Sequence, residues 1–141
     1  MGLQQNVRLL SIACLLTISC GTFPYRPGYD RNLGAYPTKG SRVKNGKWEG
    51  KIAYYGKGFH GKPTANGERF DQMAKTCAHK TLPFGTLLKV TLKKTNESVI
   101  VRVNDRGPFK PDRLVDLSYG AAKDIGLIQY GVAEAFIEIA N

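Results

Sequence analysis

The stretch Val99–Phe109 constrains this chain more than any other, because it has the pattern of a buried strand that ends abruptly. Valine recurs at alternate positions at its start, and this period of two places side chains on one face of a strand. Asn104 and Asp105 follow, and the next Gly-Pro pair forces a turn. A carboxylate at the end of a strand can be held rigidly and still reach a ligand. The alternative is an Asx-type turn that only caps the strand.

The first 19 residues have the features of an export signal (1–19) rather than of a folded domain. Leu9–Ser19 is largely apolar, and a run of about 11 residues is too short to span a bilayer but suits a signal peptide. Cys20 ends the sequence Leu-Thr-Ile-Ser-Cys, which resembles the lipobox of bacterial lipoproteins. In that motif the cysteine becomes the lipidated first residue. Cleavage without lipid attachment is the alternative, and Cys14 is a weaker competing site.

The three cysteines fit the interpretation of residues 1–19 as an export signal, and they indicate that the domain is held together by its hydrophobic core. If Cys14 leaves with the signal and Cys20 takes lipid, only Cys77 remains of the three cysteines. An intramolecular disulfide is then impossible, so packing has to hold the domain together. We interpret Cys77 as a small buried residue rather than a catalytic thiol.

The chain is strongly basic, with a formal net charge of +10. Removal of the signal takes away only Arg8, so 20 basic and 11 acidic residues remain, a net charge of +9. Basic proteins of this size can bind nucleic acid, but export argues against that partner. We expect anionic polymers of the bacterial envelope, or an anionic membrane surface, as the opposite charge.

The remaining chain divides into a flexible tether (20–46), rich in Gly and Pro, and one domain (47–141). Many short strands, Gly/Pro turns and one small helix predict a mainly β barrel rather than a parallel α/β sheet. The expected segments are strands over 48–55, 75–79, 86–93, 97–103 and 114–117, a helical turn over 68–73, a helix over 119–125 capped by Ser118 and ended by Gly126, and a final apolar segment over 131–140.

Four segments of this domain, in this order and spacing, resemble the rare lipoprotein A (RlpA) family of peptidoglycan lytic transglycosylases. They are Tyr54-Tyr55-Gly56 with Phe59-His60-Gly61, Thr64–Phe70, Ala78–Thr86, and Val101–Phe109 continuing to Leu114–Ser118. The resemblance covers residues 46–140. It implies a six-stranded double-psi β-barrel with one or two short helices, a fold shared with plant expansins.

The resemblance also implies a reaction and its catalytic residues. Lytic transglycosylases cut the β-1,4 bond between N-acetylmuramic acid and N-acetylglucosamine without water, and leave a 1,6-anhydro end. Asp105 is the implied acid and base, Glu68 the second essential carboxylate, and His79 a hydrogen-bonding residue of the site. Glu68 would stabilise charge in the transition state or orient the attacking hydroxyl. Structural roles remain open for both Glu68 and His79.

Four residues near these positions are assigned to substrate binding: Tyr55, Phe59, Asn104 and Arg106. Core packing is the alternative for the aromatic ones. A guanidinium paired with Asp105 would keep that carboxyl ionised, so we expect Arg106 to point away, toward substrate or Asp116. We interpret Asp116 as a structural partner of Arg102 or Arg106.

The implied reaction needs neither a cofactor nor a metal ion, and the chain has only two histidines, His60 and His79. The expected partners are peptidoglycan glycan strands lacking stem peptides, and a membrane that holds the lipid anchor with the domain on its extracytoplasmic side. We expect a monomer that binds no nucleic acid. The chain ends at Asn141, so we expect no C-terminal SPOR domain. The alternative function is a non-catalytic, expansin-like barrel that binds and loosens glycan.

Overall fold

The structure is a computed structural model that describes residues 42–44 and 47–140. The expected signal peptide, the lipidation site Cys20 and most of the expected tether lie outside the described residues. Strand β1 (Arg42–Lys44) falls inside the stretch assigned to the tether, and it pairs antiparallel with β2 (Lys47–Tyr54). Regular backbone pairing therefore begins a few residues earlier than the composition predicted.

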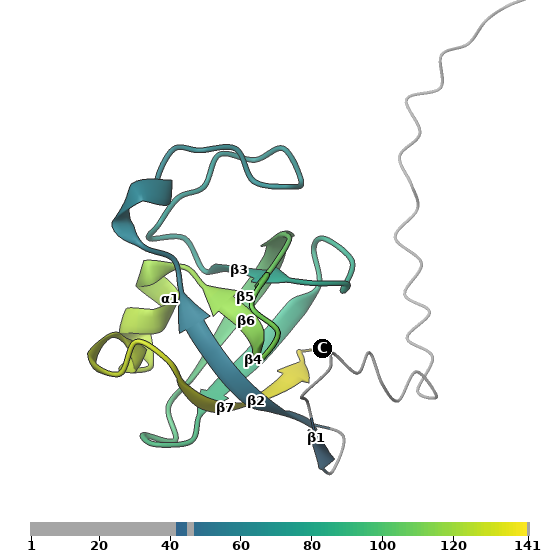
Figure 1. The fold of residues 1–141 in the computed structure, drawn as a ribbon, viewed down its shortest axis with the longest axis vertical. Coiled ribbons are helices and arrows are strands. Elements are labelled where there is room, and N and C mark those ends of the chain that lie inside the picture. Colours follow the sequence, from purple (N-terminus) through teal and green to yellow (C-terminus); the bar gives the residue numbers. More distant parts are fainter. Residues whose placement is uncertain (1–41, 45–46, 141) are drawn as a thin grey trace, which may run out of the picture.

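Six strands close into a mixed barrel, with β2 pairing with β7 to complete the circle (Figure 1). The strand order is β1-β2-β6-β3-β5-β4-β7. The pairs β2–β6 and β3–β5 are parallel and the others are antiparallel. The remaining elements are β3 (Thr76–His79), β4 (Leu87–Leu92), β5 (Ser98–Asp105), β6 (Arg113–Leu117) and β7 (Ala133–Ile139), with the short helices η1 (Lys57–Phe59), α1 (Tyr119–Asp124) and η2 (Leu127–Gln129).

The β4–β5 hairpin forms where the alternating pattern predicted it. Its valines point inward along both strands, because a period of two places alternate side chains on the same face. Asn96 in the connection has a φ of 60°, a left-handed conformation that Asn tolerates better than most residues. The hairpin ends at Asp105, so this carboxylate lies at the rim of the barrel.

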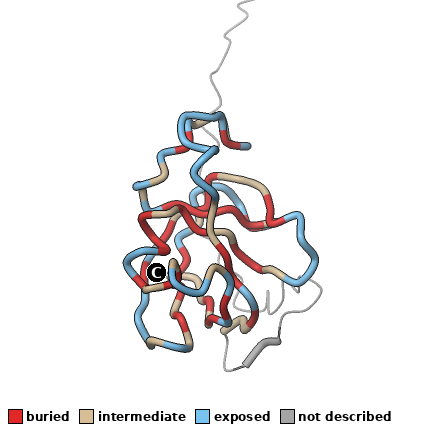
Figure 2. Tube along the Cα trace, turned by 60° about the vertical axis from the view of Figure 1, so that its left-hand side comes forward, coloured by how far each residue is buried: buried red, intermediate tan, exposed pale blue. Residues whose placement is uncertain are grey.

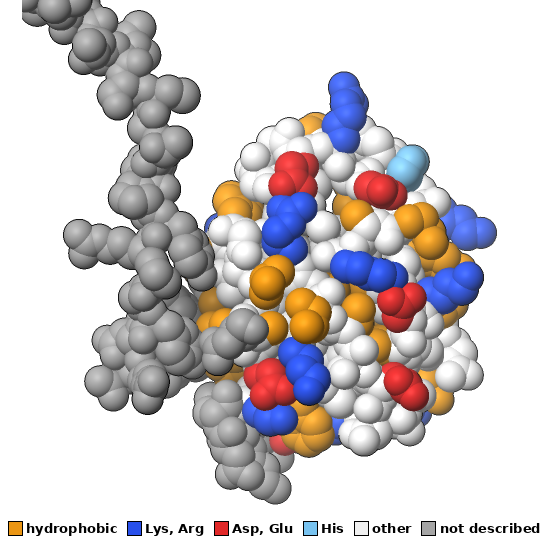
Figure 3. Space-filling view, turned by 180° about the vertical axis from the view of Figure 1, so that it is seen from behind, with side chains coloured by type: hydrophobic (Ala, Val, Ile, Leu, Met, Phe, Trp, Pro, Cys, Tyr) orange, Lys and Arg blue, Asp and Glu red, His pale blue; other side chains and the backbone are white. Residues whose placement is uncertain are grey.

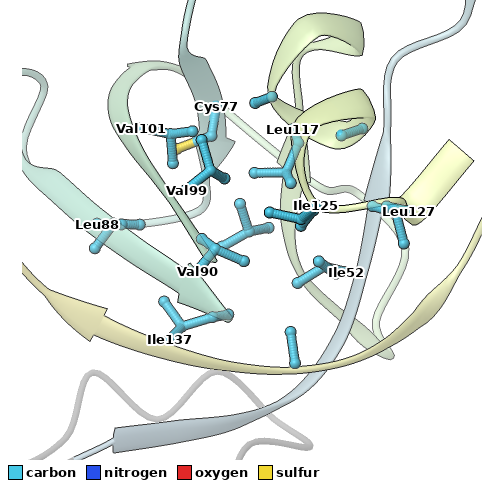
Figure 4. Packing of buried hydrophobic residues seen from close by; sticks show 14 of the residues in the cluster. Ile52, Cys77, Leu88, Val90, Val99, Val101, Leu117, Ile125, Leu127 and Ile137 are labelled. Atoms are coloured by element: carbon cyan, nitrogen blue, oxygen red, sulfur yellow. The ribbon is translucent and has the colours of Figure 1, made fainter. Parts of the chain in front are cut away.

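The barrel interior is filled by aliphatic side chains from all six strands β2 to β7 (Figure 4). Figure 2 marks the buried residues along the chain in red. Burial of each large aliphatic side chain contributes about 1.5–3 kcal/mol, and this packing holds the rim in place. The one cysteine of the described residues, Cys77, is free. Cys77 lies in this core, and burial raises the pKa of its thiol well above the ordinary value. The interpretation of Cys77 as a small buried residue is confirmed.

Helix α1 begins at its expected cap, because the Ser118 hydroxyl accepts the N–H of Ala121. Gly126, with a φ of 73°, follows the helix as expected. Within α1, a Cβ at Gly120 would lie 2.5 Å from the carbonyl oxygen of Met73. This close approach packs the helix against the loop that precedes β3.

The helical turn expected over 68–73 is wrong. Arg69 instead forms a bridge with Pro63, and the Asp71 side chain accepts the N–H of Met73 at 2.9 Å. Asp competes with helical hydrogen bonds by binding nearby backbone N–H groups, and this explains the turn. Residues 55–75 therefore form a long loop, with η1 near its start, that rises from one end of the barrel (Figure 1).

Surface charges of both signs are interspersed on the face in Figure 3, with exposed hydrophobic side chains between them. Lys47 pairs with Glu138 at 3.2 Å in a half-buried position, and Lys51 pairs with Asp112 at 3.3 Å in an exposed one. An exposed pair such as Lys51–Asp112 contributes about 0–1 kcal/mol. The longest helix among the described residues has six residues, and none of these helices could cross a membrane.

Candidate active site at the end of strand β5

Asp105, the last residue of β5, is held by three donors from three segments. The Tyr55 hydroxyl donates to Oδ2 at 2.8 Å. Oδ1 accepts the backbone N–H groups of Ala65 at 2.9 Å and Arg106 at 2.8 Å. A carboxylate offers about four acceptor positions, so Oδ2 keeps one free. The side chain is thus fixed in orientation while one oxygen remains available to a ligand.

Tyr55 comes directly after β2 and packs against two aromatic rings of the long loop. Its ring centroid lies 5.5 Å from that of Phe59 and 4.7 Å from that of Phe70. Burial, together with the Asp105 carboxylate, raises the pKa of Tyr55, so its hydroxyl stays protonated and can donate. Phe59 is about half exposed (48%) and contributes ring surface at the edge of the site.

Glu68 is held as a carboxylate with every acceptor position filled. Arg102 binds it in a fork, with Nη1 2.7 Å from Oε1 and Nη2 3.0 Å from Oε2. The amide nitrogen of Asn66 donates to Oε1 at 2.9 Å and that of Asn104 to Oε2 at 3.0 Å. These hydrogen bonds, with Arg102 first, lower the pKa of Glu68 to about 2. Four bonds use the capacity of a carboxylate.

One short segment links the two carboxylates that the sequence placed far apart. Asn66 binds Glu68 through its side chain, while its backbone N–H donates to the carbonyl of Asn104 at 3.3 Å. Its neighbour Ala65 binds Asp105. The loop therefore lies against the end of β5 and brings both carboxylates to one site, as expected.

Arg102 and Asn66 are site residues that the sequence analysis missed. The signal for Arg102 was present, because alternation with the inward valines puts Arg102 and Asn104 on one face of β5. Glu68 contacts that face only because of how the loop over residues 55–75 is aligned with β5. Periodicity carries no information about a loop register, so Asn66 had no comparable signal.

Arg106 points away from Asp105, as expected, but not toward Asp116. Its Nη1 donates to the carbonyl oxygens of Leu82 at 2.9 Å and His79 at 3.3 Å, and its guanidinium lies 3.7 Å from the centroid of Phe84. Three polar and aromatic contacts hold it there.

The expected partners of Asp116 are wrong. Arg102 is taken by Glu68, and Asp116 instead pairs with Arg113 of its own strand at 3.0 Å. Asp116 lies on the central strand β6 between β2 and β3, and burial raises its pKa. A nearby arginine on the same strand reaches this buried position more directly than one from β5.

His79 is buried at the end of β3, and its Nδ1 accepts the N–H groups of Thr81 at 3.2 Å and Leu82 at 3.0 Å. Burial, followed by the charges of Arg106 and Lys80, lowers its pKa to about 4, so the ring is neutral near pH 7. These contacts favour the structural role left open for His79, because they shape the turn whose Leu82 carbonyl binds Arg106. Its catalytic assignment stays a prediction.

Among the described residues, no group of three or more His, Cys, Asp or Glu side chains is placed to hold a metal ion. His60, the other histidine, lies on the rim of an open hollow of about 440 Å³ that it lines with Lys57, Gln72 and Tyr119. Its Nδ1 accepts the N–H of Gln72 at 3.2 Å, so the ring is hydrogen-bonded to the backbone of the long loop.

The Glu68–Arg102 pair should make the stability of the domain depend on pH in the acid range. The pKa of Glu68 is lower in the folded chain, about 2 against an ordinary 4.5, so its stabilisation is present above the ordinary value and is lost as the pH falls toward 2. We expect Glu68→Gln to lower the free energy of unfolding at about pH 6 and to have a smaller effect near pH 2.5. Denaturant unfolding at both pH values measures this, with Arg102→Gln as the matched partner. An equal effect at both pH values would contradict it.

We compared the chain with known protein families, curated proteins and solved structures. The lytic transglycolase family matches residues 47–137. Over 92 residues the chain is 56% identical to a Synechocystis protein named "Probable endolytic peptidoglycan transglycosylase RlpA", covering 65% of this chain and 29% of that protein. Over 119 residues it is 44% identical to the Vibrio cholerae "Endolytic peptidoglycan transglycosylase RlpA", covering 82% and 45%. The chain thus spans less than half the length of these relatives.

Among solved structures, the barrel is similar to a point mutant of a Clavibacter michiganensis expansin in complex with cellohexaose. The TM-score is 0.54 at 18% identity, covering 66% of this chain and 50% of that one. At that identity the likeness concerns the fold alone. It confirms the expected six-stranded double-psi β-barrel, formed here by β2 to β7.

Proposed function

The chain belongs to the lytic transglycolase family, and on that premise we propose that its barrel cleaves peptidoglycan glycan strands with Asp105 as the acid and base. The observation that carries this proposal is the setting of Asp105 at the barrel rim. Its carboxylate is oriented by Tyr55 and two backbone N–H groups, yet Oδ2 keeps a free acceptor position. A group that first gives and then takes a proton needs such a fixed but accessible oxygen.

The reaction needs only proton transfers by this one carboxyl group. Asp105 protonates the glycosidic oxygen as the bond to C1 of N-acetylmuramic acid breaks, and positive charge develops on the ring. The C6 hydroxyl of the same sugar then attacks C1 and gives its proton to the Asp105 carboxylate. The net change moves one proton from the C6 oxygen to the leaving sugar, closes a 1,6-anhydro ring, and consumes no water.

Glu68 acts as a positioning residue in this proposal. Its low pKa excludes it as the proton donor, and its four hydrogen bonds leave no acceptor position for a substrate hydroxyl. Its charge is also balanced by Arg102, and this weakens any direct stabilisation of a cationic sugar. What Glu68 does hold is the loop whose Ala65 N–H donates to Asp105. It therefore fixes the catalytic carboxylate through the loop.

The other assigned residues fall into two groups. Tyr55 and Phe59 offer partly exposed ring surface next to Asp105, which supports contact with sugar. Asn104 and Arg106 have side chains committed to Glu68 and to the turn beside Phe84, which supports positioning roles. His79 is buried beneath that turn and accepts the N–H of Leu82, which supports a positioning role for it as well.

We further propose an envelope location for the protein. The names of the relatives point to peptidoglycan, which lies outside the cytoplasmic membrane. A lipid on Cys20 would hold the domain to a membrane on the extracytoplasmic side as a monomer, with the basic surface facing anionic polymers. The lipobox-like sequence around Cys20 supports the anchor.

An expansin-like barrel that binds glycan without cutting it is the second candidate function. The expansin relative in complex with cellohexaose is the observation that favours it, because the same fold there binds a β-linked glucan oligomer. Both functions predict that the protein binds glycan, but only the transglycosylase releases cleaved fragments.

Product analysis of the purified protein tests the proposal. Glycan strands stripped of stem peptides are incubated with the protein and analysed by mass spectrometry. We expect fragments with 1,6-anhydro ends, at the mass of the uncut repeat with no water added. Retained binding without such fragments would establish the binding barrel instead, and fragments with reducing ends would indicate a hydrolase.

A further inference from the structure

Phe109 is the most exposed large hydrophobic side chain of the described residues, at 90% of its maximum. It lies four residues after Asp105, on the turn that leaves β5. Isolated exposed hydrophobic residues are common on protein surfaces, so exposure alone indicates nothing. The position of the ring is what makes this one different.

The turn beneath Phe109 is buried and fixed. Gly107 and Pro108 are both buried, and Gly107 has a φ of 130° that side chains rarely adopt. A Cβ at Gly107 would lie 3.7 Å from Cε2 of Phe109 and 3.8 Å from Cβ of Ala78. Ala78 is in turn the β3 partner of Asp105. One edge of the ring therefore lies against Gly107, in the turn that directly follows Asp105, and most of the ring surface stays open.

A cation lies at the same turn as this ring. Lys80, which follows β3, donates from Nζ to the carbonyl oxygen of Lys110 at 3.3 Å, one residue beyond Phe109. Within the described part of the chain Lys80 forms no ion pair. It does interact electrostatically with Asp116, but that carboxylate already pairs with Arg113. The ammonium group of Lys80 therefore has no ion-pair partner among the described residues, and the carbonyl oxygen that it binds belongs to the residue that directly follows Phe109.

We propose that Phe109 and Lys80 form a subsite beside Asp105 for an anionic pyranose, with the sugar ring stacked on Phe109 and its carboxylate bound to Lys80. The inference rests on the proposed function and deepens it. An open aromatic face suits the apolar C–H face of a sugar ring, and aromatic contact needs no charge. A carboxylate next to it suits an ammonium group.

The chemistry of peptidoglycan supplies such a sugar. N-acetylmuramic acid carries a lactyl carboxylate, which is free when the stem peptide has been removed and is an amide when it is present. N-acetylglucosamine has no carboxylate. The subsite therefore discriminates between the two sugars of the strand, and would set which side of the bond faces Asp105.

Binding measurements in the Asp105→Asn background separate this subsite from catalysis, because no bond is cut. The probes are a peptide-free oligosaccharide of alternating N-acetylglucosamine and N-acetylmuramic acid, and a chitooligosaccharide of equal length, titrated by calorimetry. We expect Phe109→Ala to weaken binding of both probes by about tenfold, and Phe109→Tyr to restore it. We expect Lys80→Gln to weaken only the muramic acid probe, by about 3- to 10-fold.

Tyr130→Ala is the matched control. Tyr130, which directly follows η2, is also an exposed aromatic residue, but the ammonium group of Lys94 lies over its ring. It should change neither affinity. Unchanged binding in Phe109→Ala, or equal loss of both probes in Lys80→Gln, would overturn the subsite. Absence of anhydro products from the wild-type protein would overturn the proposed function and leave these binding differences intact.

Discussion

Replacing Asp105 with Asn should lower the rate of anhydro-ended fragment release by about 100- to 10,000-fold, the range expected for loss of a general acid. The amide of Asn can neither give a proton to the glycosidic oxygen nor take one from the C6 hydroxyl. The rate is measured by quantifying anhydro-muramic ends over time with saturating peptide-free glycan.

The same substitution should leave the fold intact. Oδ1 of Asn can still accept the backbone N–H groups of Ala65 and Arg106, and the Tyr55 hydroxyl can rotate to accept from the new amide nitrogen. Unfolding midpoints should therefore stay close to the wild type. Asp112→Asn, at an exposed carboxylate paired with Lys51, is the control for a lost surface charge. Cleavage by Asp105→Asn at the normal rate would show that another group is the acid.

Local patterns predicted most of the strands, because the spacing of apolar residues within one segment is enough to identify a strand. The β4–β5 hairpin follows from alternating valines and α1 from its Ser118 cap. The helical turn expected over 68–73 was the failure, because the Asp71 side chain forms a local Asx turn there and the segment packs against Gly120 of α1, a contact that no local pattern predicts. The barrel closure itself came from the family resemblance rather than from any period.

The site divides in the same way. The position of Asp105 at a strand end is visible in the sequence, and the importance of Glu68 came from the resemblance. The contact of Glu68 with Arg102 joins residues 34 positions apart, and the loop register that creates it leaves no local signature. Arg102 was therefore assigned to the wrong carboxylate, although its face of β5 was readable.

Arg102 also provides the sharpest test of how Glu68 works, because the two possible roles predict opposite effects of its removal. If Glu68 stabilised a cationic sugar directly, Arg102→Gln would unmask its charge and leave the rate equal or higher. If Glu68 positions the loop, Arg102→Gln breaks the fork that holds it. Misplacement of a catalytic group by about 1 Å can cost on the order of 100-fold in rate.

We therefore expect Glu68→Gln and Arg102→Gln each to lower the cleavage rate by about 100-fold. The double variant should be little worse than either single one, because both changes release the same loop from β5 and with it the Ala65 N–H on Asp105. The three rates are measured on peptide-free glycan, with circular dichroism to verify folding. Lys93→Gln, which loses an ion pair with Glu49 away from this site, controls for a missing cation. A normal or raised rate in Arg102→Gln would return Glu68 to direct charge stabilisation, since only that role gains when its counterion is removed.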